Sequence, residues 1–197
     1  MNDWARKALR GAEFVASPAL AGAAFCLLAV GVVTWLPALA AAAHTLQDWR
    51  TDGSGRCFTG TLRAFPRQWR RLRREALVST ALLLLCVSNT IFLLGRGGPV
   101  LVLLPVQGVV FLALAVYGVS LAAVSAVDQD SDARQWRRTA LAFAFGSPRR
   151  TLVLAGALVV LPVAVAPVPL GPLLLGPTLP LLLALSLRAP ADPRRTA

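Results

Sequence analysis

Long uncharged apolar runs alternate with short basic segments along this chain. An α-helix of about 20 mainly apolar residues is long enough to cross the hydrocarbon core of a bilayer. The pattern therefore predicts an all-α protein, a polytopic transmembrane helical bundle with about five to six membrane segments. Residues 1–187 form its single transmembrane helical domain, and the predicted membrane segments are 19–36, a short limb at 37–47, 76–94, 100–127, 151–166 and 173–187.

The segment 56–74 is basic and amphipathic instead of uniformly apolar. At 100° per residue its apolar side chains share one narrow face of a helix, and its arginines crowd the opposite face. This pattern is typical of a helix that lies on a membrane surface, and the arginines place it on the cytoplasmic side. The apolar face holds Phe58, Leu62, Phe65, Trp69 and Leu72, and the basic face holds Arg56, Arg63, Arg67, Arg70, Arg71 and Arg74.

A second cytoplasmic amphipathic helix is predicted over residues 131–145. The acidic residues just before it suit a helix start, because carboxylates interact favourably with the amino-terminal end of a helix. Trp136 lies on the apolar side of this helix, with Arg137 and Arg138 beside it.

The apolar segment 19–47 contains Pro37, which we interpret as a helix break because proline lacks a backbone donor. Three interpretations are open: a cleaved signal peptide, one long span, or a hairpin whose second limb returns the chain to the cytoplasm. The first two place basic segments outside, against the positive-inside rule. The hairpin leaves only Arg96 outside, so we favour it. Both termini are then cytoplasmic, and residues 188–197 form a basic, disordered tail.

The composition also favours a membrane protein. With 197 residues, 56% of them hydrophobic, and a mean hydropathy of +0.65, the chain has more apolar surface than one soluble core uses. The net charge of +11 would suggest nucleic acid in a soluble protein, but these basic residues lie beside apolar runs. We therefore expect the lipid bilayer and its anionic headgroups as partners, and no nucleic acid.

Residues suited to catalysis are sparse. The three cysteines, Cys26, Cys57 and Cys86, are widely spaced, and His44 is the only histidine. No disulfide framework, metal site or catalytic triad follows from them. No motif for nucleotide, zinc or acyl-transfer chemistry occurs in the sequence. We therefore expect no enzymatic activity, no cofactor, no metal and no catalytic residue.

The predicted membrane segments contain no acidic or basic side chain apart from His44 near an edge. Ion-coupled transporters and proton pumps usually carry such groups within their spans. The polar residues that do occur there include Ser88, Asn89 and Gln107. In lipid, residues of this kind more often form interhelical hydrogen bonds of about 0.6 kcal/mol than bind a substrate. The pattern favours helix packing over transport.

Two short motifs are similar to those of a known family. The run VVTWLPALAAA is followed by a polar link and by CFTGTLRAFPRQWRR, which leads into an apolar run. This order resembles the YesL family of bacterial integral membrane proteins, although Leu36 stands where that family has glycine. The matching residues are Thr34, Pro37, Ala38, Ala40 and Ala41 in the first motif, and Phe58, Phe65 and Trp69 in the second.

The resemblance implies a location in the bacterial cytoplasmic (inner) membrane and a role beside carbohydrate uptake systems of the ATP-binding-cassette (ABC) type. We therefore expect a non-enzymatic accessory or regulatory component that contacts permease or ATPase subunits. A small-solute transporter in its own right, a membrane-surface organising protein and a homo-oligomer stay open. The expected anchoring or docking residues are Phe58, Arg63, Phe65, Arg67, Trp69, Arg70, Arg71, Arg74, Trp136, Arg137 and Arg138.

Overall fold

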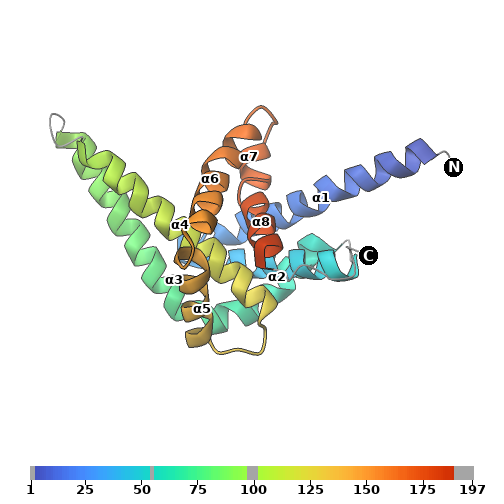
Figure 1. Ribbon diagram of the computed structural model, residues 1–197, viewed down its shortest axis with the longest axis horizontal. Coiled ribbons are helices and arrows are strands. Elements are labelled where there is room, and N and C mark those ends of the chain that lie inside the picture. The colour runs from blue at the N-terminus through green and yellow to red at the C-terminus, as the bar shows by residue number, and fades with distance from the viewer. Residues whose placement is uncertain (1–2, 54–55, 97–101, 189–197) are drawn as a thin grey trace.

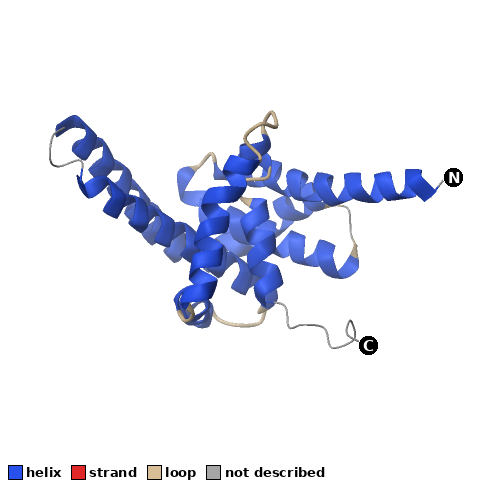
Figure 2. Ribbon diagram, turned by 45° about the horizontal axis from the view of Figure 1, so that its top comes forward, coloured by secondary structure: helices blue, strands red, loops and turns tan. Residues whose placement is uncertain are grey.

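Every regular element in the described part of the chain is a helix, so the all-α prediction is confirmed (Figure 2). The computed structural model describes residues 3–53, 56–96 and 102–188, with side chains from residue 16 onward. The predicted tail therefore lies outside the described residues beyond Arg188. The helices are α1 (Asp3–Ala29), the 3-10 helix η1 (Val32–Thr34), α2 (Trp35–Asp52), α3 (Cys57–Arg96), α4 (Leu104–Val127), α5 (Ala133–Phe145), α6 (Pro148–Ala164), α7 (Gly171–Leu174) and α8 (Thr178–Arg188).

Within the described residues, three helical segments are long and apolar enough to cross a membrane: α3, α4 and the stretch Gly171–Arg188 that contains α7 and α8. The pair α5 and α6, bent by 90°, is a fourth candidate if the two helices form one broken span. The predicted segment 19–36 falls instead on η1 and on α1, whose apolar stretch Ala16–Ala29 is shorter. The structure thus contains three to four candidate spans where the sequence predicted five to six.

Helix α2 occupies the predicted short limb, but it is a core helix and not one of the candidate spans. All residues from Leu36 to Ala43 are buried, because α1, α3, α4 and α8 pack around it. The chain breaks between α1 and α2, just before Pro37, and Pro37 itself does not interrupt α2. It lies in the first turn of α2, where a missing backbone donor leaves no hydrogen bond unmade. The chain turns just before it, where the Thr34 hydroxyl donates to the Leu28 carbonyl.

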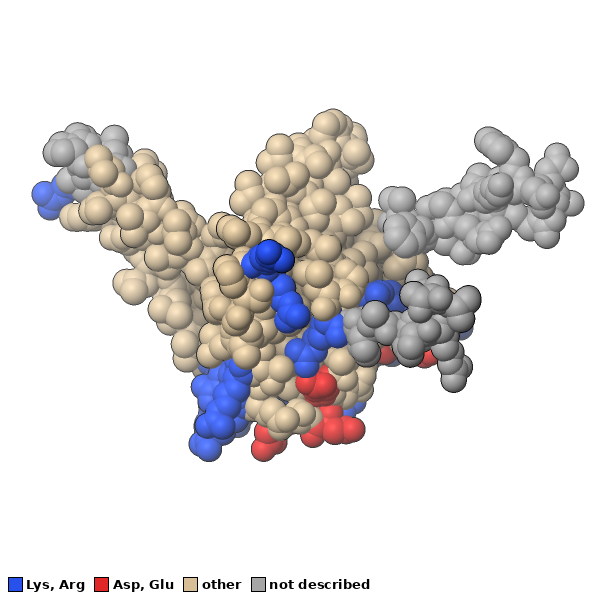
Figure 3. Space-filling model, in the orientation of Figure 1, with Lys and Arg blue, Asp and Glu red and all other residues tan. Residues whose placement is uncertain are grey.

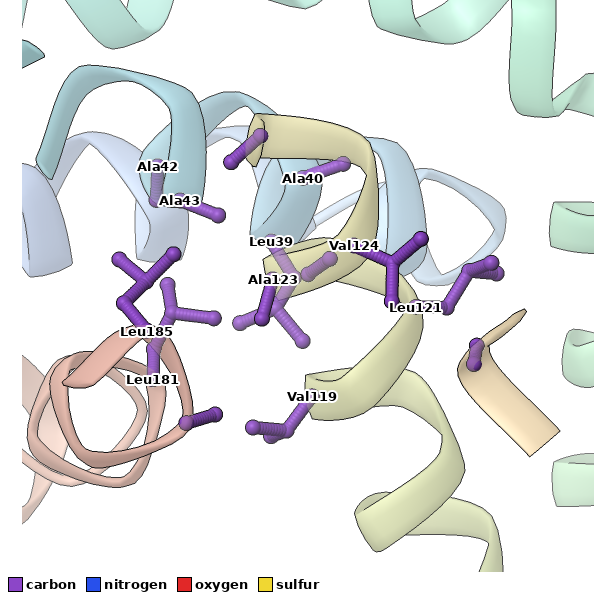
Figure 4. Close-up of a cluster of buried hydrophobic side chains, with 14 of the residues drawn as sticks. Leu39, Ala40, Ala42, Ala43, Val119, Leu121, Ala123, Val124, Leu181 and Leu185 are labelled. Atoms are coloured by element: carbon purple, nitrogen blue, oxygen red, sulfur yellow. The ribbon is translucent and has the colours of Figure 1, made fainter. Parts of the chain in front are cut away.

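The core is built where α2, α4 and α8 meet. Figure 4 shows Leu181 and Leu185 of α8 pointing toward the alanines of α2, with Val119 and Val124 of α4 nearby. Lipid is as apolar as these side chains, so burial from water adds little to helix association inside a membrane. Close van der Waals packing is then the main attraction, and the alanines permit it because small side chains let helix backbones approach.

Helix α3 combines the predicted surface helix 56–74 and the predicted span 76–94 in one helix of 40 residues. In Figure 1 its amino-terminal part lies across the bundle and its carboxyl-terminal part rises to the left. The face fully buried in the amino-terminal part is formed by Cys57, Thr61, Gln68 and Leu72. Of the predicted apolar face only Leu72 is fully buried, and its other members, including Phe65 and Trp69, are half buried. Packing against α2 thus selects a face centred on smaller and more polar side chains.

The carboxyl-terminal half of α3 and the amino-terminal half of α4 lie side by side and project from the bundle as an arm (Figures 1 and 2). Many large apolar side chains of this α3–α4 arm are exposed, including Leu85, Ile91 and Val109. Its amides pair across the two helices, because Asn89 Nδ2 donates to Gln107 Oε1 over 3.0 Å. Gln107 Nε2 donates in turn to the Cys86 carbonyl over 3.0 Å. The polar residues of this arm therefore serve helix packing.

Helices α6 and α8 form a second projecting unit, which the short helix α7 joins at its far end (Figure 1). The predicted segments 151–166 and 173–187 fall on α6 and on the stretch that contains α7 and α8. Helix α1 approaches α7 closely at Gly22. A Cβ atom built on Gly22 would lie 1.7 Å from the Leu174 carbonyl oxygen. Only glycine fits at this contact.

Replacing Gly22 with alanine should therefore force α1 away from α7. Overpacking of this kind typically costs about 1–3 kcal/mol, so we expect a lower thermal unfolding midpoint of the purified protein in detergent. The matched control is Gly156→Ala in α6, since a Cβ atom there meets nothing within 4 Å. An unchanged midpoint for Gly22→Ala would contradict the close contact between α1 and α7.

Candidate functional site

Charged side chains gather at one end of the bundle. Figure 3 shows the blue and red atoms in the middle and lower part of the view, while the described tan surface above them is largely uncharged. The exception is the tip of the α3–α4 arm, where α3 ends at Arg96. We call the charged end the base. Its described charged residues belong to the end of α2, the first half of α3, the α4–α5 loop, α5, the start of α6 and the end of α8.

The α4–α5 loop holds α5 in place at the base. Trp136 of α5 is buried, and its Nε1 donates to the Asp128 carbonyl over 2.7 Å. The Asp128 carboxylate pairs with Arg188 at the end of α8, with 2.5 Å between Oδ2 and Nη2. Asp128 therefore joins α5 to α8 through its backbone and its side chain together.

Three contacts join α3 to α5 and to the loop before it. Arg71 Nη1 donates to the Gln129 carbonyl over 2.6 Å, and the same guanidinium lies 5.4 Å from the centre of the Trp136 ring. Arg137 Nε lies 3.2 Å from Glu75 Oε1. The two predicted amphipathic helices, far apart in sequence, therefore meet at the base.

Between these helices lies a basic groove of about 370 Å³. Four of its side chains are guanidinium groups, and one is a carboxylate. Arg74 and Arg134 make no hydrogen bond or ion pair with any described residue, so their charges are available to a ligand. The residues that line this groove are Arg71, Arg74, Glu75, Val78, Ala133, Arg134 and Arg137.

The predicted site residues divide into two groups. Arg71, Arg74 and Arg137 line the basic groove, and Trp136 supports it from below Arg71. Arg138 lies one helical turn after Arg134 on α5, where it lines an adjoining depression together with Arg134, Arg137 and Leu141. The remaining predicted residues are not lining residues of the groove and lie nearer the amino terminus of α3: Phe58, Arg63, Phe65, Arg67, Trp69 and Arg70.

The sequence prediction did not include Glu75, Arg134, Asp128 and Arg188 among the site residues. Arg134 lies one helical turn before Arg137, so helical spacing alone could have placed both on one face. The ion pair between Asp128 and Arg188 joins positions 60 residues apart and has no local signal. Long-range contacts of this kind become visible only once the helices are packed.

A second, apolar groove of about 460 Å³ separates the α3–α4 arm from α6. Trp35 lies at its inner end and packs on Gly118, where an added Cβ atom would lie 2.9 Å from the indole ring. The buried Trp35 Nε1 has no hydrogen-bond partner among the described residues. The groove is lined by Trp35, Leu83, Gly108, Phe111, Leu112, Leu114, Ala115, Leu158 and Val159.

The residues considered for metal or redox chemistry stay apart. His44 lies beside Asp48, with 3.4 Å between Nδ1 and Oδ1, within the single helix α2. No group of three or more metal-binding side chains occurs among the residues that the structure describes. Cys57 and Cys86 are buried on different parts of α3, and Cys26 lies in α1. The basic groove is therefore the candidate functional site.

Replacing Asp128 with asparagine should weaken the attachment of α5 and α8. We expect each of Asp128→Asn and Arg188→Gln to lower the free energy of unfolding by about 0.5–1 kcal/mol, because the pair is partly exposed. The double variant should lose less than the sum of the two, as contacting residues do in a double-mutant cycle. Asp130→Asn is the control, since Asp130 is exposed and has no ion pair among the described residues. Additive losses would contradict a direct ion pair.

No family model, no curated protein and no solved structure matches this chain. The resemblance to the YesL family thus depends on the sequence motifs alone. In the structure, Thr34 of the first motif bonds to the Leu28 carbonyl, and Pro37 to Ala41 lie buried in α2. These residues shape the core, while the basic groove lies at the base.

Proposed function

We propose that this protein is a non-enzymatic accessory subunit of the bacterial cytoplasmic membrane that packs on the transmembrane helices of a transport complex. Its base faces the cytoplasm, and the α3–α4 arm contacts the partner. The main support for this proposal is that the α3–α4 arm exposes many large apolar side chains together with the amide of Asn89.

The separation of charge supports the membrane orientation. The base concentrates arginines, whereas Arg96 is isolated at the far tip of the α3–α4 arm. Basic residues are retained on the cytoplasmic side of a membrane more strongly than on the outer side. The amino-terminal part of α3, with its half-buried aromatic side chains, then lies near the inner membrane surface, where such side chains are favoured.

The surface of the arm supports a protein partner. Asn89 is exposed among apolar neighbours, and only its Nδ2 has a hydrogen-bond partner among the described residues, in Gln107. Ser88 beside it is also exposed. Polar side chains at membrane depth stabilise contacts between helices, and leaving them in lipid is costly. A partner helix on this face would cover the amides and offer them further hydrogen bonds.

The chemistry of the partner follows from the resemblance to the YesL family. The permease and ATPase subunits of a carbohydrate importer of the ABC type are the first candidates to test. A transport path through this chain itself is less well supported, because the groove between the arm and α6 is lined by apolar side chains that suit no sugar. Its apolar helices also lack acidic and basic side chains that ion coupling requires.

Labelling from the two sides of the membrane tests the orientation. Cys57 is buried, so its thiol is unsuitable for this measurement. In a chain with its three cysteines replaced by alanine, we expect Arg67→Cys to react with a membrane-impermeant maleimide only after the cells are opened. Arg96→Cys should react in intact cells, because Arg96 lies at the far tip of the arm. The reverse pattern would contradict the proposed orientation.

Purification of the tagged full-length protein in mild detergent, with protein identification by mass spectrometry, tests the partner. We expect permease or ATPase subunits to be recovered with it. Asn89→Leu should reduce this recovery by about tenfold or more, because an interhelical hydrogen bond and the fit of the contact are lost. Thr90→Val is the matched control, since the Thr90 hydroxyl already donates to the Cys86 carbonyl within its own helix.

Two outcomes of this purification, and one of a separate uptake assay, would count against the accessory role. Recovery of the protein alone would contradict the proposal that it binds permease or ATPase subunits. Recovery of a second copy of this chain, with no transport subunit, would make the arm a dimer contact. Uptake of a sugar by the purified protein in liposomes would make it a transporter. The thermal unfolding midpoints of the two variants provide a control for folding. If Asn89→Leu unfolds at the same temperature as Thr90→Val, its reduced recovery reflects a lost contact with the partner and not an unfolded protein.

A further inference from the structure

We propose that the basic groove between α3 and α5 binds the phosphate of an anionic phospholipid, with the acyl chains of that lipid running along the α3–α4 arm. The groove is defined by residues from both predicted amphipathic helices and by the turn of α3 at which basic residues give way to apolar ones. Its composition and its position point to the same ligand.

The charges in the groove favour a phosphate. Glu75 is paired with Arg137, which offsets the only carboxylate in the lining. Arg74 of α3 and Arg134 of α5 both line the groove without a hydrogen-bond or ion-pair partner among the described residues. A guanidinium presents a planar fork of donors that matches a phosphate in two parallel hydrogen bonds. The groove therefore offers unengaged donors of the geometry that phosphate oxygens accept.

One arginine of the groove is already held in place. Arg71 is fixed by its bond to the Gln129 carbonyl and by its position over the Trp136 ring. The Trp136 ring is fixed in turn by its bond to the Asp128 carbonyl. A side chain that is already ordered loses less conformational entropy when a ligand binds. Arg71 thus contributes positive potential at little entropic cost.

The position of the groove favours a lipid over a free phosphate or an acidic protein segment. Along α3 the lining changes from Arg71 and Arg74 to Val78 within about one helical turn. Exposed apolar side chains continue beyond it on the same helix, including Leu82 and Leu85. A phospholipid matches both parts, because its phosphate meets the arginines and its acyl chains meet the arm. Basic pockets at the cytoplasmic ends of membrane helices bind such headgroups in general.

Binding of a lipid from the inner leaflet in the cell rests on the proposed function, which places the base on the cytoplasmic side. Binding of lipid by the purified protein in detergent requires neither that orientation nor a protein partner. Failure of lipid binding therefore leaves the accessory role intact, and failure of partner recovery leaves the lipid site intact.

The experiment is native mass spectrometry of the full-length protein in a neutral detergent, titrated with phosphatidylglycerol and, separately, with phosphatidylcholine. We expect one phosphatidylglycerol to bind in preference to phosphatidylcholine. Replacing both Arg74 and Arg134 with glutamine should weaken this binding by about tenfold or more, because charge-assisted hydrogen bonds are lost. Inorganic phosphate at millimolar concentration should displace little of the lipid, since it lacks the acyl-chain contacts.

The matched control replaces Arg63 and Arg67 of α3 with glutamine, which removes the same charge from residues that do not line the groove. We expect this control to bind phosphatidylglycerol within about twofold of the unmodified protein. If the Arg74 variant proves unstable, Arg74→Lys and Arg134→Lys keep the charge but lose the fork, and an intermediate loss is expected.

Several results would overturn the proposal. If the groove variant and its control lose phosphatidylglycerol binding equally, the lipid is attracted by the overall surface charge and not by a specific site. Equal binding of phosphatidylcholine would remove the preference for an anionic lipid. Complete displacement by inorganic phosphate would make the groove a site for free phosphate, and complete displacement by an acidic peptide with no lipid preference would make it a protein contact.

Discussion

The close packing of four helices around α2 is the constraint on which the rest of this structure depends. Residues Leu36 to Ala43 are buried on every side, and most of them are alanine. Larger side chains there would push α1, α3, α4 and α8 apart, because protein interiors are packed to the density of crystals. Inside a membrane the penalty is more serious, since few other forces bring helices together.

This packing also positions the basic groove. Helix α3 packs against α2, where the Thr61 hydroxyl lies 3.4 Å from that of Thr45, and the arginines of α3 are turned outward. Helix α4 ends at the base, and its following loop accepts hydrogen bonds from Trp136 and Arg71. The distance between α3 and α5 is therefore set by backbone carbonyls of one loop. These two hydrogen bonds help to hold several like charges close together, which would otherwise repel each other.

The two amides of the α3–α4 arm illustrate how polar groups can couple two helices whose surfaces are otherwise apolar. Gln107 bridges Asn89 and the Cys86 carbonyl, which couples the two helices where their other contacts are apolar. Ser120 and Thr80 differ, because each has a buried hydroxyl with no partner among the described residues. Polar side chains of α3 and α4 thus form interhelical hydrogen bonds at some positions and have no partner among the described residues at others. The position of each helix decides which outcome occurs.

Some features could be predicted from local pattern alone. The helical class and the basic character of the stretch that ends near Arg74 depend on residues within a few turns of each other. Helical periodicity also placed Arg71 and Arg74 on the exposed side of α3. Other features were missed, such as the burial of Leu36 to Ala43 in a helix that four other helices contact. The residues of a short sequence segment do not show which distant helices will pack against it.

The sequence by itself determined that this chain is helical, which of its segments are apolar, and which carry the basic charge. These properties depend on side-chain chemistry and helical period, and both are local. Only the tertiary structure decided that the 37–47 segment is core and that Arg71, Arg74, Arg134 and Arg137 share one groove. The physical reason is that helices can meet in many arrangements, and long-range packing and hydrogen bonds between distant residues select one of them.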